Sequence, residues 1–141
     1  MAASEKLNEK YIVYQILAQN LESLKQQMQL VEQQLFELNS ALMSLEDLHK
    51  MDDQNEIFLP LGGGCFGKGK ITENDKILVN VGSGIFLDEN TEGAKKLLQE
   101  RLREIERAGK EIEDQAEKIA LQMNELAAEI QKMAQMESKK S

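Results

Sequence analysis

The feature that most constrains this chain is a hydrophobic repeat that occurs twice, once towards each end. In the first repeat, apolar residues follow one another at alternating steps of three and four from Tyr14 to Leu45. The second repeat runs in the same way from Leu98 to Met133, and Gly109 is its one member without an apolar side chain. A period of 3.5 residues kept over so many turns is the heptad pattern of a coiled coil. The seam positions are Tyr14, Leu17, Leu21, Leu24, Met28, Val31, Leu35, Leu38, Leu42 and Leu45, then Leu98, Leu102, Ile105, Gly109, Ile112, Ala116, Ile119, Met123, Leu126, Ile130 and Met133.

The two repeats are of similar length, and neither contains proline. Each predicts a helix of about 45 residues, or ~70 Å at the helical rise of 1.5 Å. We expect the helices to fold back on each other as a long antiparallel coiled-coil hairpin, because large seam residues of the first then meet small ones of the second. The alternative is that each helix forms a parallel dimer with an unrelated partner. In the hairpin, the expected neighbours are Leu45 and Leu98, Leu35 and Gly109, Met28 and Ala116, and Tyr14 and Ile130.

The segment between the repeats has a period of two instead. Four short apolar runs alternate there, and they are separated by Gly62-Gly63-Gly64, by residues 72–76 and by Gly82-Ser83-Gly84. Short alternating runs with glycine turns predict two small β-hairpins in series. The expected fold class is therefore α+β, with an N-terminal coiled-coil helix at 1–50, two β-hairpins forming an oligomerisation body at 51–90, and a C-terminal coiled-coil helix at 91–141.

Strands this short cannot bury two faces by themselves, and Pro60 favours an edge position for the first. Unpaired strand edges recruit other strands, so we expect the hairpins at the base of the coiled coil to join an oligomeric β-barrel. The residues expected at this subunit interface are Ile57, Leu59, Leu61, Ile71, Ile77, Val79, Val81, Ile85 and Leu87.

The far ends of the two helices are poor in charge, and the run from Tyr11 to Leu21 has none. Several apolar residues there lie off the heptad seam, and methionines gather near the chain's end. An apolar patch at an exposed tip is typical of a contact surface, and methionine adapts to partners of varied shape. The alternative is a fraying helix end whose extra apolar residues widen the seam. The residues expected to bind a partner are Leu7, Tyr11, Ile12, Val13, Ile16, Leu126, Ile130, Met133 and Met136.

The stretch LGGGCFGKGK, residues 61–70, matches parts of two nucleotide-binding motifs. A phosphate loop, however, needs its Gly-Lys to open a helix and a Ser or Thr to follow, whereas Lys68 lies in an alternating run and position 69 is glycine. A dinucleotide fold needs a crossover helix for which the middle segment has no room. We therefore expect the glycines to serve turns and close strand approach, and ATP to have no role.

Composition narrows the partners, cofactors and functional classes that remain open. The net charge of −8 disfavours a nucleic-acid partner. A single cysteine, Cys65, and a single histidine, His49, offer neither a zinc site nor a nucleophile with its base. No apolar run is long enough to span a bilayer. We expect a cytoplasmic protein with no cofactor, no metal, no membrane contact and no enzymatic activity.

The order of long helix, IFLPLGGGCFGKGKI, KILVNVGSGIFLDEN and long helix resembles the α-class subunit of prefoldin, of the archaeal type, over nearly the whole chain. The two hairpins are the most specific part, because β-class subunits carry one. The resemblance implies a hexamer of two α and four β-class subunits with six coiled-coil tentacles. It implies a chaperone that holds non-native proteins at the tentacle tips without ATP and passes them to a group II chaperonin. The alternative function is a structural coiled-coil scaffold or tether that binds one defined partner.

Overall fold

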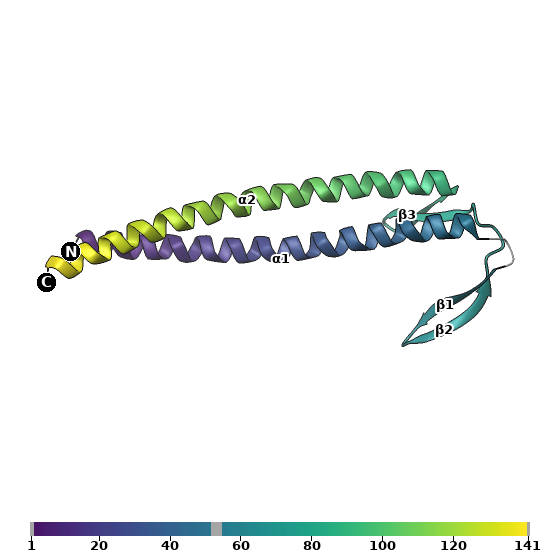
Figure 1. The fold of residues 1–141 in the computed structure, drawn as a ribbon, viewed down its shortest axis with the longest axis horizontal. Helices are drawn as coiled ribbons and strands as arrows, with labels where there is room; N and C mark the ends of the chain where they lie inside the picture. Colours follow the sequence, from purple (N-terminus) through teal and green to yellow (C-terminus); the bar gives the residue numbers. More distant parts are fainter. Residues whose placement is uncertain (1, 52–54, 141) are drawn as a thin grey trace. The chain divides into compact units, whose positions relative to one another are not determined.

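The computed structural model describes residues 2–51 and 55–140 of the chain. Its elements, in order, are α1 (Ala2–Lys50), β1 (Glu56–Gly62), β2 (Cys65–Lys70), β3 (Ile77–Gly82), β4 (Ile85–Glu89) and α2 (Thr91–Lys140) (Figure 1). Two long helices and two small antiparallel hairpins confirm the expected α+β class. The chain divides into two units, one of residues up to Gln34 together with those from Ile105 onward, the other Leu35–Glu104.

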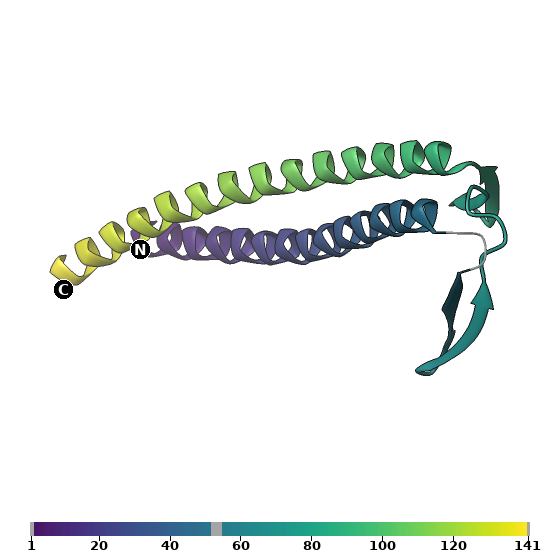
Figure 2. The same ribbon diagram turned by 45° about the vertical axis from the view of Figure 1, so that its right-hand side comes forward.

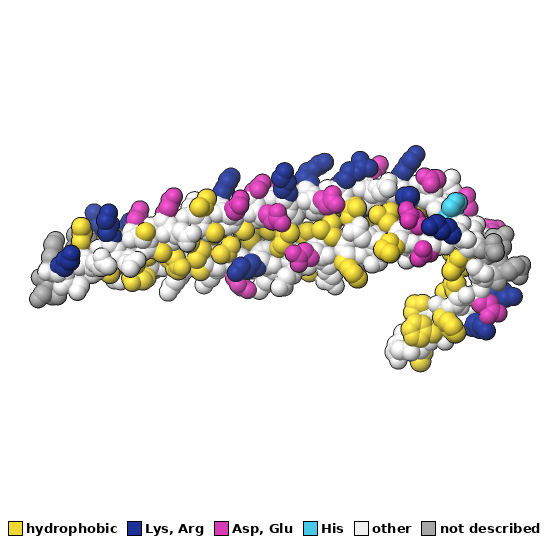
Figure 3. All heavy atoms as spheres, in the orientation of Figure 1, with side chains coloured by type: hydrophobic (Ala, Val, Ile, Leu, Met, Phe, Trp, Pro, Cys, Tyr) yellow, Lys and Arg dark blue, Asp and Glu magenta, His cyan; other side chains and the backbone are white. Residues whose placement is uncertain are grey.

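The first unit is an antiparallel pair made by the first part of α1 and the last part of α2. Figures 1 and 2 both show these two stretches side by side, with the chain's termini at the same end of the unit. Lys10 of α1 forms an ion pair with Glu129 of α2. Hydrophobic side chains follow the line along which the helices meet, with charged side chains outside it (Figure 3). Among the residues that the structure describes, those buried in this unit are Leu24, Val31, Gly109 and Ile130, all of them predicted seam positions.

The expected partner of Gly109 was wrong by about one helical turn. A Cβ atom at Gly109 would lie 3.1 Å from Cγ1 of Val31 and 3.7 Å from Cε of Met28, with no atom of Leu35 among its nearest neighbours. A seam residue enters a hole formed by several residues of the facing helix, and a straight helix drifts against a strict heptad. Counting from the ends therefore defines a partner only to within a turn. The expected pairing of Tyr14 with Ile130 is close, because both line one groove.

The second unit contains both hairpins, each a separate two-stranded antiparallel sheet. The turn residues are Gly63-Gly64 in the first hairpin and Ser83-Gly84 in the second, and all four have positive φ. Positive φ at both central residues is the type I′ turn, whose twist matches that of the strands it joins. In both hairpins the pairing also shifts by one residue just before the turn. The two hairpins predicted from the glycines are confirmed.

The core of the second unit lies where β3 meets the two helices. Val79 of β3 packs with Leu45 of α1 and Ala94 of α2, and all three are buried. Around them lie the partly buried side chains of Ile77, Leu97 and Leu98, so the expected neighbours Leu45 and Leu98 do share one cluster. Arg101 of α2 donates a hydrogen bond to the carbonyl of Asn80. Lys95 and Glu46 form an ion pair at 3.3 Å between the helices.

Candidate contact surfaces

The first contact surface lies at the end of the first unit that holds both termini. Four consecutive or near-consecutive apolar side chains of α1, at positions 11, 12, 13 and 16, are about half exposed, and Ile12 reaches 55%. On α2, Met136 is 61% exposed. Residues one position apart on a helix point in different directions, so these side chains cannot all enter one seam. They give this end of the helix pair apolar surface outside the seam.

Two grooves between the helices adjoin these residues. The first has a volume of about 350 Å³ and is lined by Tyr11, Tyr14, Ala127, Ile130, Gln131 and Ala134. The second, of about 340 Å³, is lined by Val13, Leu17, Gln122, Glu125, Leu126 and Glu129. Alanines facing tyrosines leave the first groove open beside aromatic rings. Both grooves have room for apolar side chains of another chain.

The residues predicted to bind a partner are distributed unevenly over this surface. Tyr11, Ile12, Val13, Ile16 and Met136 are exposed, whereas Leu7, Leu126 and Met133 are half-buried. Ile130 is only 8% exposed, so its side chain holds the two helices together and reaches the surface as one wall of the first groove.

Sequence reasoning missed some residues of this surface. Ala127 and Ala134 line the first groove, and their small size opposite two tyrosines was the available signal. It also missed three exposed apolar residues further along α1, Leu30, Phe36 and Met43, and Leu121 of α2. All four lie off the seam, which was the signal that could have found them.

The second contact surface is formed by the hairpins. Among the predicted interface residues, Leu59, Leu61, Val81, Ile85 and Leu87 are exposed, and Ile57, Ile71 and Ile77 are half-buried. Val79 is 6% exposed and packs inside its own chain. Large exposed side chains that the prediction omitted are Phe58, Phe66, Leu78 and Phe86. All but Phe66 lie between two predicted residues of the same strand. The hairpins thus present apolar side chains on both faces, and Figure 3 shows hydrophobic side chains at the surface of the β1–β2 hairpin.

The glycine-rich stretch lies in the first hairpin. Lys68 is within β2, opposite Phe58, and its ammonium group is 2.8 Å from a carboxylate oxygen of Glu56. Gly69 continues the strand, so Gly67-Lys68 does not open a helix as a phosphate loop requires. This local structure is the one predicted for residues 65–70.

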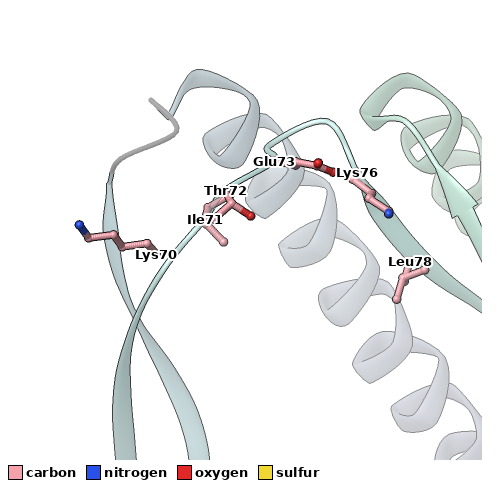
Figure 4. Close-up of a pocket in the computed structure, with 6 residues that line it drawn as sticks. All are labelled: Lys70, Ile71, Thr72, Glu73, Lys76 and Leu78. Atoms are coloured by element: carbon pink, nitrogen blue, oxygen red, sulfur yellow. The ribbon is translucent and has the colours of Figure 1, made fainter.

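A hollow of about 470 Å³ follows the first hairpin and is lined by Lys70, Ile71, Thr72, Glu73, Lys76 and Leu78. The amino groups of Lys70 and Lys76 point away from each other (Figure 4). Lys76 also lies 3.9 Å from Asp88. The hollow therefore does not direct its positive charges at one ligand.

Two further properties concern only residues 2–51 and 55–140. Within these ranges, the acidic, histidine and cysteine side chains form no group of three or more that could hold a metal ion. Neither helix has a stretch apolar enough, over a sufficient length, to cross a bilayer.

Two long helices linked through two β-hairpins, with apolar surface on the hairpins and at the helix ends, define a coiled-coil subunit built for contact with other proteins. The family model described as "Prefoldin subunit" matches residues 17–136. The chain belongs to the prefoldin family, whose members are subunits of molecular chaperones and not enzymes.

Individual relatives agree with this family. The chain is 30% identical to prefoldin subunit alpha of Pyrococcus horikoshii over 140 residues, which cover 98% of this chain and 95% of the relative. It is 28% identical to prefoldin subunit alpha of Thermofilum pendens, over 89% of this chain and 95% of that one. Its fold is similar to a chain of the filamentous PFD of Methanocaldococcus jannaschii, with a TM-score of 0.73 and 19% identity over 82% of this chain and 96% of that one.

Proposed function

We propose that this chain is the α-class subunit of a cytoplasmic, ATP-independent holdase. In this proposal, the apolar ends of the helices hold non-native proteins and the complex passes them to a group II chaperonin. The hairpins of residues 51–90 join β-class subunits in a hexamer of two α and four β chains. The similarity to relatives named prefoldin subunit alpha supports a place beside β-class subunits. The composition of the hexamer and the delivery step rest on the resemblance to the prefoldin family.

The observation that carries the proposal is the exposed apolar surface where the helices end. Ile12, Ile16 and Met136 each expose half or more of their side chain, and the two grooves lie beside them. A monomeric protein gains nothing from such a surface, whereas a partner with exposed apolar segments can bury it. Methionine and a shallow groove suit clients of many shapes.

The assembly step is supported by the β1–β2 hairpin. All its residues are exposed or half-buried, and the large side chains Phe58, Leu61 and Phe66 are among the most exposed of the described chain. A lone two-stranded hairpin is marginal in water, so further strands would stabilise it. We expect β-class subunits to supply them.

The test removes apolar surface at the helix ends without shortening the helices. The triple variant Ile12→Gln, Ile16→Gln and Met136→Gln replaces exposed apolar side chains by a good helix former. The matched control is Leu30→Gln, Phe36→Gln and Met43→Gln, which removes the same number of exposed apolar side chains elsewhere. Each is assembled with a β-class subunit and verified to have the same mass.

The measurement is light scattering of a chemically unfolded enzyme diluted into each complex, without ATP. The end variant should lose most of its protection, because several weak contacts act together and each loss multiplies through effective concentration. The control should protect like the natural chain. Equal protection by the end variant would refute the role of the helix ends.

Two additions separate the proposal from a scaffold that binds one partner. A holdase should protect several unrelated unfolded enzymes, and ATP should change none of these results. Addition of a group II chaperonin to the client-loaded complex should transfer the client to the chaperonin, as judged by size-exclusion chromatography. Protection of one enzyme alone would favour the scaffold.

A further inference from the structure

The loop between the two hairpins contacts the end of α1 through Asn74. The side-chain amide nitrogen Nδ2 donates to the carbonyl oxygen of Met51 at 2.9 Å and to that of His49 at 3.3 Å. Both partners are carbonyl oxygens, which only accept, so the amide nitrogen and not the amide oxygen must face them. The last carbonyls of a helix have no partner within the helix. Asn74 supplies one from 23 and 25 residues further along the chain.

The next residue of the same loop contacts the start of α2. Oδ1 of Asp75 accepts the backbone N–H of Thr91 at 2.9 Å, and the Thr91 hydroxyl donates to the carbonyl of Asn74 at 3.3 Å. Thr91 is 5% exposed, so these bonds replace water for a buried polar residue. Asn90 adds an ordinary cap by accepting the N–H of Gly93 at 2.7 Å.

Charge favours the same arrangement. The N-terminus of a helix carries partial positive charge, which attracts a carboxylate such as Asp75. The hydrogen bond from the backbone N–H of Thr91 holds the pKa of Asp75 below its ordinary value. The carboxylate therefore stays ionised at neutral pH.

We infer that Asn74 and Asp75 form a brace that holds the end of α1 to the start of α2. Within the second unit, the first hairpin ends at Lys70 and the second begins at Ile77, on either side of the brace. The brace thus sets where both hairpins attach to the helices. Asn74 and Asp75 are positioning residues for the two hairpins, a role that does not depend on whether the chain holds clients.

The polarity of the brace allows a sharp test with paired substitutions. Asn74→Ala removes the donor. Asn74→Asp keeps nearly the same shape but places an acceptor against two carbonyl oxygens, so it should weaken the brace more. Asp75→Ala removes the acceptor, whereas Asp75→Asn can keep the bond to Thr91 and should be milder. The matched control is Glu73→Gln, which removes a neighbouring exposed charge.

The measurement is amide hydrogen exchange of the full-length chain, followed by mass spectrometry on peptides that cover residues 90–97 and 44–51. Peptides from residues 110–120 report on α2 away from the brace. We expect exchange near Thr91 to be roughly tenfold faster in Asp75→Ala, with a smaller change in Asp75→Asn and none in Glu73→Gln. Asn74→Asp should deprotect both helix ends more than Asn74→Ala, while residues 110–120 keep their protection.

Two results would overturn the inference. One is equal exchange in Asn74→Asp and Asn74→Ala, which would mean that the amide donor does not matter. The other is unchanged exchange near Thr91 in Asp75→Ala. If Asn74→Asp fails to fold, exchange near Thr91 in Asp75→Ala and Asp75→Asn still tests the inference.

Discussion

The two hairpins have nearly the same local structure and very different surroundings. Each residue of the first has a counterpart twenty positions later, such as Ile57 and Ile77 or Gly62 and Gly82, and both hairpins have the same turn and the same irregularity before it. Yet Val79 of the second hairpin is 6% exposed, whereas its counterpart Leu59 in the first is 47% exposed. The second hairpin packs against the helices of its own chain through Val79. In the first hairpin, the apolar side chains remain exposed or half-buried.

The difference comes from contacts rather than from strand propensity. Val79 has Leu45 and Ala94 to pack against, and Asn80 accepts a hydrogen bond from Arg101. In the first hairpin, Leu59 and Leu61 of β1 lie over glycines of the paired strand β2, 3.1 Å and 3.5 Å from where Cβ atoms of Gly69 and Gly67 would be. Similar local sequences can therefore be buried by packing within the chain in one place and left exposed in another.

The largest expected effect comes from a charged substitution at Val79, compared with the same substitution at its counterpart Leu59. Val79→Lys buries an unpaired charge and should destabilise the chain by about 3 kcal/mol or more. Leu59→Lys, at the counterpart position, should change stability by less than about 0.5 kcal/mol but weaken assembly with a β-class subunit. Thermal unfolding by circular dichroism measures the first effect, and native mass spectrometry the second. Equal destabilisation by the two variants would remove the distinction between the hairpins.

A smaller effect is expected at the polar link between the second hairpin and α2. Arg101→Gln removes the charged donor to the Asn80 carbonyl and should cost about 1.5 kcal/mol. The loss should appear as faster amide exchange in β3 and β4, with β1 and β2 unchanged. Arg103→Gln, an exposed neighbour, is the control. Faster exchange in both hairpins would show that Arg101 acts on the whole unit.

The next prediction exchanges serine and glycine between the equivalent turn positions 83 and 63. Ser83 has a φ of +52°, which costs a non-glycine residue about 1 kcal/mol. Ser83→Gly should therefore stabilise the second hairpin, and Gly63→Ser, where φ is +60°, should destabilise the first by a similar amount. Amide exchange of each hairpin measures both changes. If both substitutions moved protection in the same direction, the two turns would not be equivalent.

The smallest effect is a dependence on pH at the brace. The pKa of Asp75 is lowered from 3.8 in the folded chain, mainly by the hydrogen bond from the backbone N–H of Thr91. A lowered pKa means that the ionised carboxylate stabilises the fold above pH 3.8 and that this contribution is lost as pH falls through the folded-state value. On acidification, protection near Thr91 should fall in the natural chain, and Asp75→Asn should abolish this dependence. A pH dependence that persists in Asp75→Asn would assign it to another group.

Much of the local structure could be predicted from the sequence alone. Heptad spacing without proline predicted both helices, and glycine turns between alternating residues predicted both hairpins and the strand position of Lys68. These features depend on neighbouring residues, because helical periodicity and positive φ are local requirements. The exposed apolar residues at positions 11–13 and 16 were also within reach, since an off-seam residue has no place in the coiled coil.

Tertiary structure alone decided which of the similar residues became buried. Val79 and Leu59 occupy equivalent places in similar hairpins, and Gly109 meets Val31 instead of Leu35. From the sequence alone, the loop of Asn74 and Asp75 looks like an ordinary polar turn. In the structure, its two side chains bind the ends of two helices. Burial and capping of this kind depend on segments far apart in the chain, whose approach is governed by the packing of all of them together and not by any local pattern.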